Sequence, residues 1–270
     1  FYQLLHARPA EKFMQRKYPL LNCVTDSQRV KIVKDIFSTV TARYDFLNSL
    51  FSLRRDLFWR RSAVRKMRFF KTGRFLDVAT GTCELAVEAA LRHPHINIVG
   101  LDLVEDMLDF GGKKIEKKAL SSRIELLRAD ALNMPFPERH FDVAGIAFGI
   151  RNVPEKIGLL KEMARVVVPG GQIMILEMNF PENPLIRDAY NFYLNTILPF
   201  IARAFSPNPE AYSYLGDSIL NFPSPEVFSG MMKSAGLIEI EIYPLTFGIT
   251  HLYTGYKPVS LPGPYPSNRY

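Results

Sequence analysis

The segment Phe75-Leu-Asp-Val-Ala-Thr-Gly-Thr-Cys-Glu84 predicts a buried strand that runs into a tight turn and then into a helix. Its apolar beginning carries one acidic residue, Asp77, and its turn is centred on Gly81. Because glycine has no Cβ, backbone N–H groups in such a turn can approach a ligand closely. An ordinary strand–turn–helix corner of an α/β protein has the same pattern, so the choice depends on the strands that follow.

Carboxylates also follow the next two predicted strands. The apolar run 96–101 ends at Asp102, where a carboxylate can accept hydrogen bonds from a ribose diol. Beyond the third strand, Asp130 is placed to accept a hydrogen bond from an adenine amino group, and Ala131 leaves room for the ring. A single aspartate at the start of a loop is more often a cap or turn residue. Three of them, counting Asp77, favour a binding site for adenosine.

The composition of the first turn favours S-adenosylmethionine over a dinucleotide. Dinucleotide sites use G-x-G-x-x-G, whose glycines let a pyrophosphate reach the N-terminus of a helix. Here Gly81 is the only glycine between Ala79 and Glu84, so a pyrophosphate would be held poorly. S-adenosylmethionine carries a ribose and an adenine but no phosphate. We therefore expect it as the cofactor.

Composition limits the class of protein. A hydrophobic fraction of 47% in 270 residues allows a sizeable core and excludes wholesale disorder. The two cysteines, Cys23 and Cys83, cannot form a disulfide framework, and neither lies in a metal-ligand pattern. We therefore expect no metal and a reducing, cytoplasmic compartment. No apolar run reaches the ~18 residues needed to cross a bilayer.

The net charge of +7 is concentrated in basic residues between Arg54 and Arg74. Such a cluster could face anionic lipid or nucleic acid. No RNA-binding motif with interleaved aromatic residues accompanies it, so no nucleic-acid partner is expected. The favoured interpretation is the solvated face of a helix whose other side is apolar. Contact with the inner face of a membrane is a hypothesis.

The order of elements predicts the architecture. Strands and helices alternate from residue 74 to residue 178, as in a parallel sheet with helices on both faces. We predict an N-terminal arm (1–25), a single domain (26–257) and a C-terminal tail (258–270). Within the domain we predict a helical cap (26–70), a cofactor-binding core (71–178), a helical substrate region (179–235) and a terminal strand pair (236–257).

More specific motifs extend over residues 30–257. The most distinctive is Phe148-Gly-Ile-Arg-Asn-Val153, directly after the apolar strand 141–147. Further motifs are Ala42-Arg-Tyr-Asp45, Trp59-Arg60, Arg165-Val-Val-Val-Pro-Gly-Gly171, Tyr212-Ser-Tyr-Leu215, Phe222-Pro223 and Gly255-Tyr-Lys257. With these motifs the chain resembles the S-adenosylmethionine-dependent C-methyltransferases of ubiquinone and menaquinone biosynthesis.

This resemblance implies a Rossmann-like class I methyltransferase fold of the α/β class. Its seven-stranded sheet is mostly parallel with an antiparallel last strand, and it has an N-terminal helical cap and a helical insertion before the last two strands. The implied cofactor-binding residues are Gly81 and Thr82 for the methionine portion, Asp102 for the ribose, Asp130 and Ala131 for the adenine, and Asp77 for the loop or the cofactor's amino group.

The implied reaction is methylation of a ring carbon of a prenylated quinol, either demethylmenaquinol or 2-polyprenyl-6-methoxy-1,4-benzoquinol. The candidate catalytic residues are Arg151, Asn152 and Tyr44. A cationic Arg151 would stabilise a developing phenolate, Asn152 would orient the hydroxyl or a water, and Tyr44 would line the pocket. As an alternative, Arg151 forms a structural ion pair with Glu177 or Asp142.

The apolar segment 190–201 would give the isoprenoid tail an exit, although such a helix is usually core or a dimer interface. The expected partner is therefore a prenylated quinol, with a peripheral membrane contact and a homodimer as hypotheses. Two other functions stay open. One is methylation of another small aromatic metabolite, and the other is a non-catalytic S-adenosylmethionine-binding subunit. The sequence does not distinguish benzoquinol from naphthoquinol or fix the length of the tail.

Overall fold

A computed structural model describes residues 25–40, 44–205, 208 and 210–259 of the chain. It contains one seven-stranded sheet in the order β3-β2-β1-β4-β5-β7-β6. The strands are β1 (Arg74–Val78), β2 (Asn97–Asp102), β3 (Ile124–Arg128), β4 (Phe141–Ala147), β5 (Val167–Met178), β6 (Ile238–Leu245) and β7 (Thr250–Tyr256). Strands β1 to β5 pair in parallel, whereas β7 is antiparallel to both β5 and β6. The predicted fold class is confirmed.

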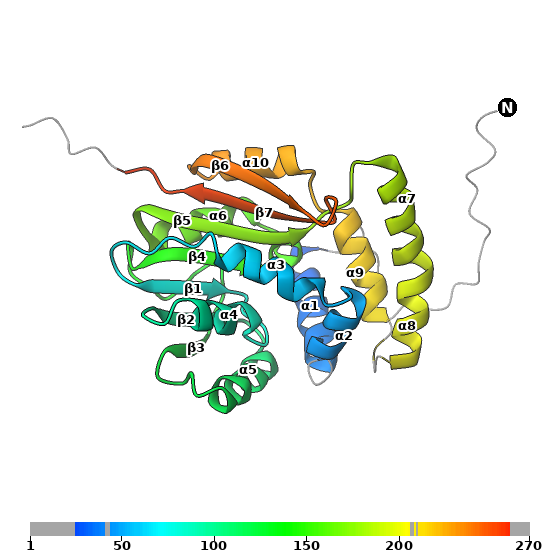
Figure 1. Cartoon of the computed structure of the whole chain (residues 1–270), viewed down its shortest axis with the longest axis horizontal. Helices are drawn as coiled ribbons and strands as arrows, with labels where there is room; N and C mark the ends of the chain where they lie inside the picture. Colours follow the sequence, from blue (N-terminus) through cyan, green and yellow to red (C-terminus); the bar gives the residue numbers. More distant parts are fainter. Residues whose placement is uncertain (1–24, 41–43, 206–207, 209, 260–270) are drawn as a thin grey trace, which may run out of the picture.

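Helices cover both faces of the sheet and gather beyond one edge of it (Figure 1). They are α1 (Asp26–Val40), α2 (Tyr44–Phe51), α3 (Arg55–Val64), α4 (Glu84–Arg92), α5 (Glu105–Lys117), α6 (Lys156–Val166), α7 (Pro184–Phe192), α8 (Leu198–Phe205), α9 (Glu210–Leu220) and α10 (Pro225–Ser234). A 3-10 turn, η3 (Ile150–Asn152), follows β4, and a π-helix, η4 (Tyr193–Ile197), joins α7 to α8. No helix in the described part of the chain is long and apolar enough to cross a membrane.

Side chains that alternate along the strands build two cores. Phe75 packs into a cluster with α3, α4 and α5, whereas its neighbour Leu76 packs into a cluster with α6 and α10. Successive residues of a strand point to opposite faces, so both faces of a central strand are apolar when helices cover both. This packing fixes the carboxyl ends of β1, β2, β3 and β4 at a common edge.

A third core joins two segments that lie far apart in the sequence. Ile36 of α1 and Leu47 of α2 pack with Tyr190, Leu194 and Leu198 of the helical region that precedes β6. Figure 1 shows these helices together on the right, beyond the arrowheads of β1 and β5. The N-terminal cap and the helical insertion therefore form one layer over the carboxyl edge of the sheet.

The predicted helical cap (26–70) is interrupted before α3. The short helix α2 precedes α3, and α3 ends at Val64. Leu53 and Arg54, with φ of 49° and 60°, occupy the left-handed region between α2 and α3. Residues other than glycine rarely adopt this conformation, so no local sequence pattern indicates the break.

A buried carboxylate holds the chain between α3 and β1. Asp142 of β4 accepts hydrogen bonds from the backbone N–H groups of Thr72 and Gly73 at 2.9 and 2.8 Å. Asp142 is 0% exposed, so these backbone donors replace the water that its carboxylate lacks. Apart from Thr25 and residues 258–259, the predicted arm and tail lie outside the described residues.

Candidate functional site

Two adjoining cavities lie at the carboxyl edge of the sheet. The first, of about 180 Å³, is formed by the loops after β1, β2, β3 and β4 and by α1. All the cofactor-binding residues that the sequence predicted line it: Asp77, Gly81, Thr82, Asp102, Asp130 and Ala131. Asn152 lines the same cavity. The structure thus brings together predicted site residues from the ends of four strands.

Asp77 holds the turn after β1 in shape. Its Oδ2 accepts hydrogen bonds from Thr80 Oγ1 at 2.6 Å and from the Ala86 backbone N–H at 3.0 Å. Burial raises the pKa of this carboxyl to about 7. The turn passes through Gly81 with φ of 55°, and a Cβ there would meet no atom within 4 Å. The space on this side of Gly81 is therefore open.

Asp102 joins the first two loops. Its two carboxylate oxygens accept hydrogen bonds from the backbone N–H groups of Gly81 at 2.8 Å and Val104 at 2.9 Å. Burial raises the pKa of this carboxyl. Each carboxylate oxygen has two lone pairs, so Asp102 keeps acceptor capacity for a hydroxyl. Asp130 is exposed and accepts from the Leu132 N–H at 2.9 Å, as in an Asx turn.

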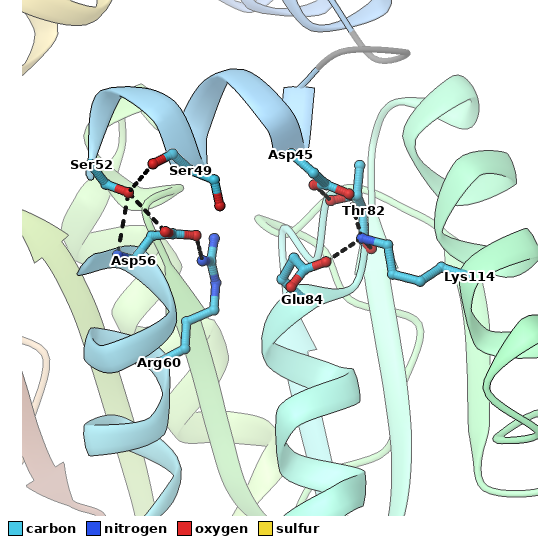
Figure 2. A network of polar contacts seen from close by, with 8 residues as sticks. All are labelled: Asp45, Ser49, Ser52, Asp56, Arg60, Thr82, Glu84 and Lys114. Atoms are coloured by element: carbon cyan, nitrogen blue, oxygen red, sulfur yellow. Dashed lines mark hydrogen bonds and ion pairs between the residues drawn. The ribbon is translucent and has the colours of Figure 1, made fainter. Parts of the chain in front are cut away.

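A polar network, which we call the clasp, ties α2 to this cofactor loop (Figure 2). It consists of Asp45, Thr82, Glu84 and Lys114. Asp45 accepts from Thr82 Oγ1 at 2.5 Å and from Lys114 Nζ at 2.6 Å. Lys114 Nζ also donates to the Thr82 carbonyl at 2.8 Å and pairs with Glu84. Sequence reasoning placed Asp45 in a motif but did not connect it to the loop.

The second cavity, of about 460 Å³, is larger and mainly apolar. It lies between α2, α3, α7, α8, α9 and the turn between β6 and β7. Its lining includes Phe51, Leu53, Trp59, Tyr190, Leu194 and Phe247. Two residues, Arg60 and Phe148, line both cavities. The predicted apolar segment therefore forms part of a pocket wall, and the junction between the cavities is an arginine beside an aromatic ring.

Arg151 lines the second cavity but is bound on several sides. Its Nη1 pairs with Glu177 Oε1 at 2.6 Å and donates to the Phe148 carbonyl at 2.7 Å, and its Nε contacts Ser218 Oγ at 3.3 Å. Glu177 is 0% exposed. Of the two ion pairs considered from the sequence, the pair with Glu177 is present, while Asp142 is occupied elsewhere.

Of the other two catalytic candidates, Asn152 lines the first cavity. Asn152, in η3, accepts a hydrogen bond from the Tyr214 hydroxyl at 3.2 Å. Tyr44 begins α2, and its side chain lies outside the described residues. His251, in β7, is 8% exposed and does not line either of these two cavities. Arg60 was missed as a site residue, although it stands in the Trp59-Arg60 motif.

Comparison with known sequences identifies relatives over most of the chain. The sequence model of the ubiE/COQ5 methyltransferase family matches residues 23–257. The ubiquinone/menaquinone biosynthesis C-methyltransferase UbiE of Geobacter sp. (strain M21) is 44% identical over 86% of this chain and 98% of that protein. The demethylmenaquinone methyltransferase of Geobacillus kaustophilus is 37% identical over 83% of this chain and 96% of that protein.

Solved structures share the fold at lower identity. An S-adenosylmethionine-dependent methyltransferase of Thermotoga maritima superposes with a TM-score of 0.57 at 20% identity, covering 83% of this chain and 99% of its own. A phosphoethanolamine N-methyltransferase of Haemonchus contortus, in complex with S-adenosylmethionine, gives a TM-score of 0.55 at 16% identity, covering 74% of this chain and 52% of its own. Both similarities concern the fold alone.

Proposed function

The chain belongs to the ubiE/COQ5 methyltransferase family, and from this membership we propose that it methylates a ring carbon of a prenylated quinol with S-adenosylmethionine. The observation that carries the proposal is the pair of adjoining cavities. A cavity with polar strand ends opens beside a larger apolar one, and the two share Arg60 and Phe148. Methyl transfer needs donor and acceptor in line and in contact, which such a junction permits.

The first cavity is assigned to the methyl donor. Asp102 would accept hydrogen bonds from the ribose, and Asp130 with Ala131 would bind the adenine. Thr82 and the open backbone at Gly81 would hold the methionine portion, within a loop that Asp77 fixes. When bound, S-adenosylmethionine supplies a methyl group already activated by its sulfonium. The protein's residues therefore need only to orient the two reactants and stabilise charge.

The second cavity is assigned to the acceptor. The cap (26–70) and the helical region (179–235) supply its apolar walls, and these walls would bury the isoprenoid tail. The ring would then lie at the junction, near the carboxyl end of β4. There Asn152 would orient the hydroxyl or a water, and Tyr44 would complete the wall. We assign Arg151 a positioning role, because it holds the Phe148 carbonyl while its charge is balanced by Glu177.

Methyl transfer tests this function directly. The purified protein is incubated with methyl-labelled S-adenosylmethionine and with demethylmenaquinol, a methoxy-benzoquinol, and small aromatic acceptors without a tail. We expect label on a ring carbon of a prenylated quinol, because an isoprenoid tail suits the apolar lining of the second cavity. Label on the small aromatics alone would favour the alternative function, methylation of another small aromatic metabolite. Tight donor binding with no labelled product from any acceptor would favour the non-catalytic subunit.

Exposed side chains at the mouth of the second cavity support a peripheral membrane contact. Leu53 and Phe247 line this cavity and are each 79% exposed. Arg54 and Arg55, next to Leu53, are exposed as well. Apolar tips beside arginines suit the boundary of an anionic bilayer. A quinol could then enter the cavity from the lipid phase. The predicted homodimer stays a prediction.

Liposome flotation tests this contact. The double variant Leu53→Ser/Phe247→Ser is expected to bind vesicles containing phosphatidylglycerol at least about tenfold more weakly, since each apolar side chain contributes roughly 1.5 kcal/mol or more when buried. The matched control is Leu91→Ser on α4, which removes an exposed leucine outside both cavities. Equal flotation of the double variant, the control and the unchanged protein would contradict the contact.

A further inference from the structure

Arg60 occupies the wall that the two cavities share. It belongs to α3, its side chain is 9% exposed, and it lines both cavities. Its guanidinium carbon lies 5.2 Å from the centroid of the Phe148 ring, within the range of a cation–π contact. A charged group at this place faces both proposed binding sites.

The Arg60 guanidinium pairs with a carboxylate of its own helix, α3. Asp56, one turn earlier, pairs with Arg60 Nη1 at 2.8 Å and accepts a hydrogen bond from Ser52 Oγ at 2.7 Å (Figure 2). Within the described part of the chain, Nη1 is the only nitrogen of the Arg60 side chain with a hydrogen-bond partner. Its Nε and Nη2 therefore keep donor capacity for a ligand.

Arg151, the other arginine of the site, is placed differently. Its nitrogens contact a carboxylate, a carbonyl and a hydroxyl, and its partner Glu177 is completely buried. Its charge is therefore balanced inside the protein. Arg60 also pairs with a carboxylate, that of Asp56, but only through its Nη1. Its Nε and Nη2 are the donors that an anionic ring oxygen would need.

The aromatic wall beside Arg60 is fixed. Phe148 has φ of 59°, a conformation that is uncommon outside glycine, and its N–H donates to the Leu176 carbonyl at 2.7 Å. The Trp59 ring lies 5.9 Å from the Phe148 ring, and its Nε1 donates to Thr246 Oγ1 at 2.8 Å. Backbone and side-chain contacts therefore keep the junction in one geometry.

We propose that Arg60 is a catalytic residue, whose guanidinium donates hydrogen bonds to a ring oxygen of the quinol and stabilises it as a phenolate. This inference rests on the proposed function. The phenol first loses its proton to water. An electron pair of the phenolate ring then forms the new C–C bond, while the S–CH₃ bond breaks and its pair stays on sulfur as a thioether. The ring carbon finally gives its proton to water, which restores the aromatic ring.

In this sequence Arg60 moves no proton and changes no bond. It lowers the energy of the anion that attacks, because an opposite charge at about 4–6 Å lowers the pKa of an acidic group by 1–3 units. A single oriented donor to a developing oxyanion contributes about 10²–10³ in rate. Arginine suits this role because its very high pKa keeps it charged throughout.

The test compares Arg60→Met and Arg60→Lys with Arg61→Met, which removes a half-exposed arginine on the same helix, outside both cavities. For each variant, calorimetry gives the Kd of S-adenosylhomocysteine, turnover gives the kcat–pH profile, and ultraviolet absorbance gives the pKa of the quinol phenol in the ternary complex with S-adenosylhomocysteine. We expect Arg60→Met to bind the nucleoside within about threefold of the unchanged protein.

The kcat of Arg60→Met should fall about 100-fold or more. The apparent pKa of the acidic limb of its kcat–pH profile and the pKa of the bound phenol should both rise by roughly one to three units. Arg60→Lys should recover part of each effect, and Arg61→Met should match the unchanged protein. A loss of donor affinity equal to the loss of kcat/KM, with an unshifted phenol pKa, would instead assign Arg60 to the donor's carboxylate. If the unchanged protein methylates no quinol, the proposed function itself fails; normal turnover by Arg60→Met refutes this inference alone.

Discussion

Arg151→Met is expected to lower the free energy of unfolding by about 3–5 kcal/mol, because it leaves Glu177 as an unpaired charge in a site with 0% exposure. The variant also loses the hydrogen bond to the Phe148 carbonyl. Urea unfolding at neutral pH measures this effect. The size of the loss reflects the cost of a buried, uncompensated charge more than the worth of the ion pair itself.

Two further variants separate the causes. Arg151→Met/Glu177→Gln removes both charges and should recover much of the lost stability. Arg61→Met breaks the partly exposed contact with Glu88 at 3.3 Å and should cost less than about 1 kcal/mol. If Arg151→Met unfolds at the same urea concentration as the unchanged protein yet has no turnover, the direct catalytic role considered from the sequence would replace the positioning role.

Asp102→Ala is expected to weaken the binding of S-adenosylmethionine by about 3 kcal/mol, or more than 100-fold in Kd. The variant loses the proposed acceptor for the ribose and also the hydrogen bonds that fix Gly81 and Val104. Calorimetry with S-adenosylhomocysteine measures the affinity. Because burial raises the pKa of Asp102, affinity in the unchanged protein should fall as the pH is lowered and the carboxylate is protonated.

Two control variants separate the loss of the Asp102 side chain from a general loss of negative charge. Asp102→Asn keeps the shape and one acceptor oxygen, so its affinity should lie between those of Asp102→Ala and the unchanged protein. Asp109→Ala removes an exposed carboxylate of α5 that does not line the first cavity, and it should leave the Kd unchanged. Undiminished binding by Asp102→Ala would remove the assignment of the first cavity to a nucleoside.

The sequence predicted those features that repeat along the chain or lie within one loop. The alternation of apolar runs led to the sheet and its helical layers, because the period of such runs reflects burial directly. The loop around Gly81 and the carboxylates Asp102 and Asp130 were found because the ends of parallel strands meet at one edge. The ion pair of Arg151 was predicted as one of two alternatives, since sequence alone does not say which carboxylate comes within reach.

The features that were missed depend on packing between distant segments. The break before α3 lies at Leu53 and Arg54, whose left-handed backbone is supported by surrounding structure and not by their own preference. The role of Arg60 depends on two cavities meeting at its side chain. The clasp joins Asp45 to Lys114 across 69 positions, and no local pattern relates residues at that separation.

The clasp has a thermodynamic consequence for the order and strength of ligand binding. One short helix, α2, touches the donor loop through Asp45, while Asn48 and Phe51 of the same helix line the acceptor cavity. A ligand in one cavity that displaces α2 would therefore change the walls of the other cavity. Linkage then requires reciprocity: whatever factor a quinol introduces into nucleoside affinity, the nucleoside introduces into quinol affinity. We therefore expect heterotropic cooperativity between the two substrates, transmitted through the eight residues of α2.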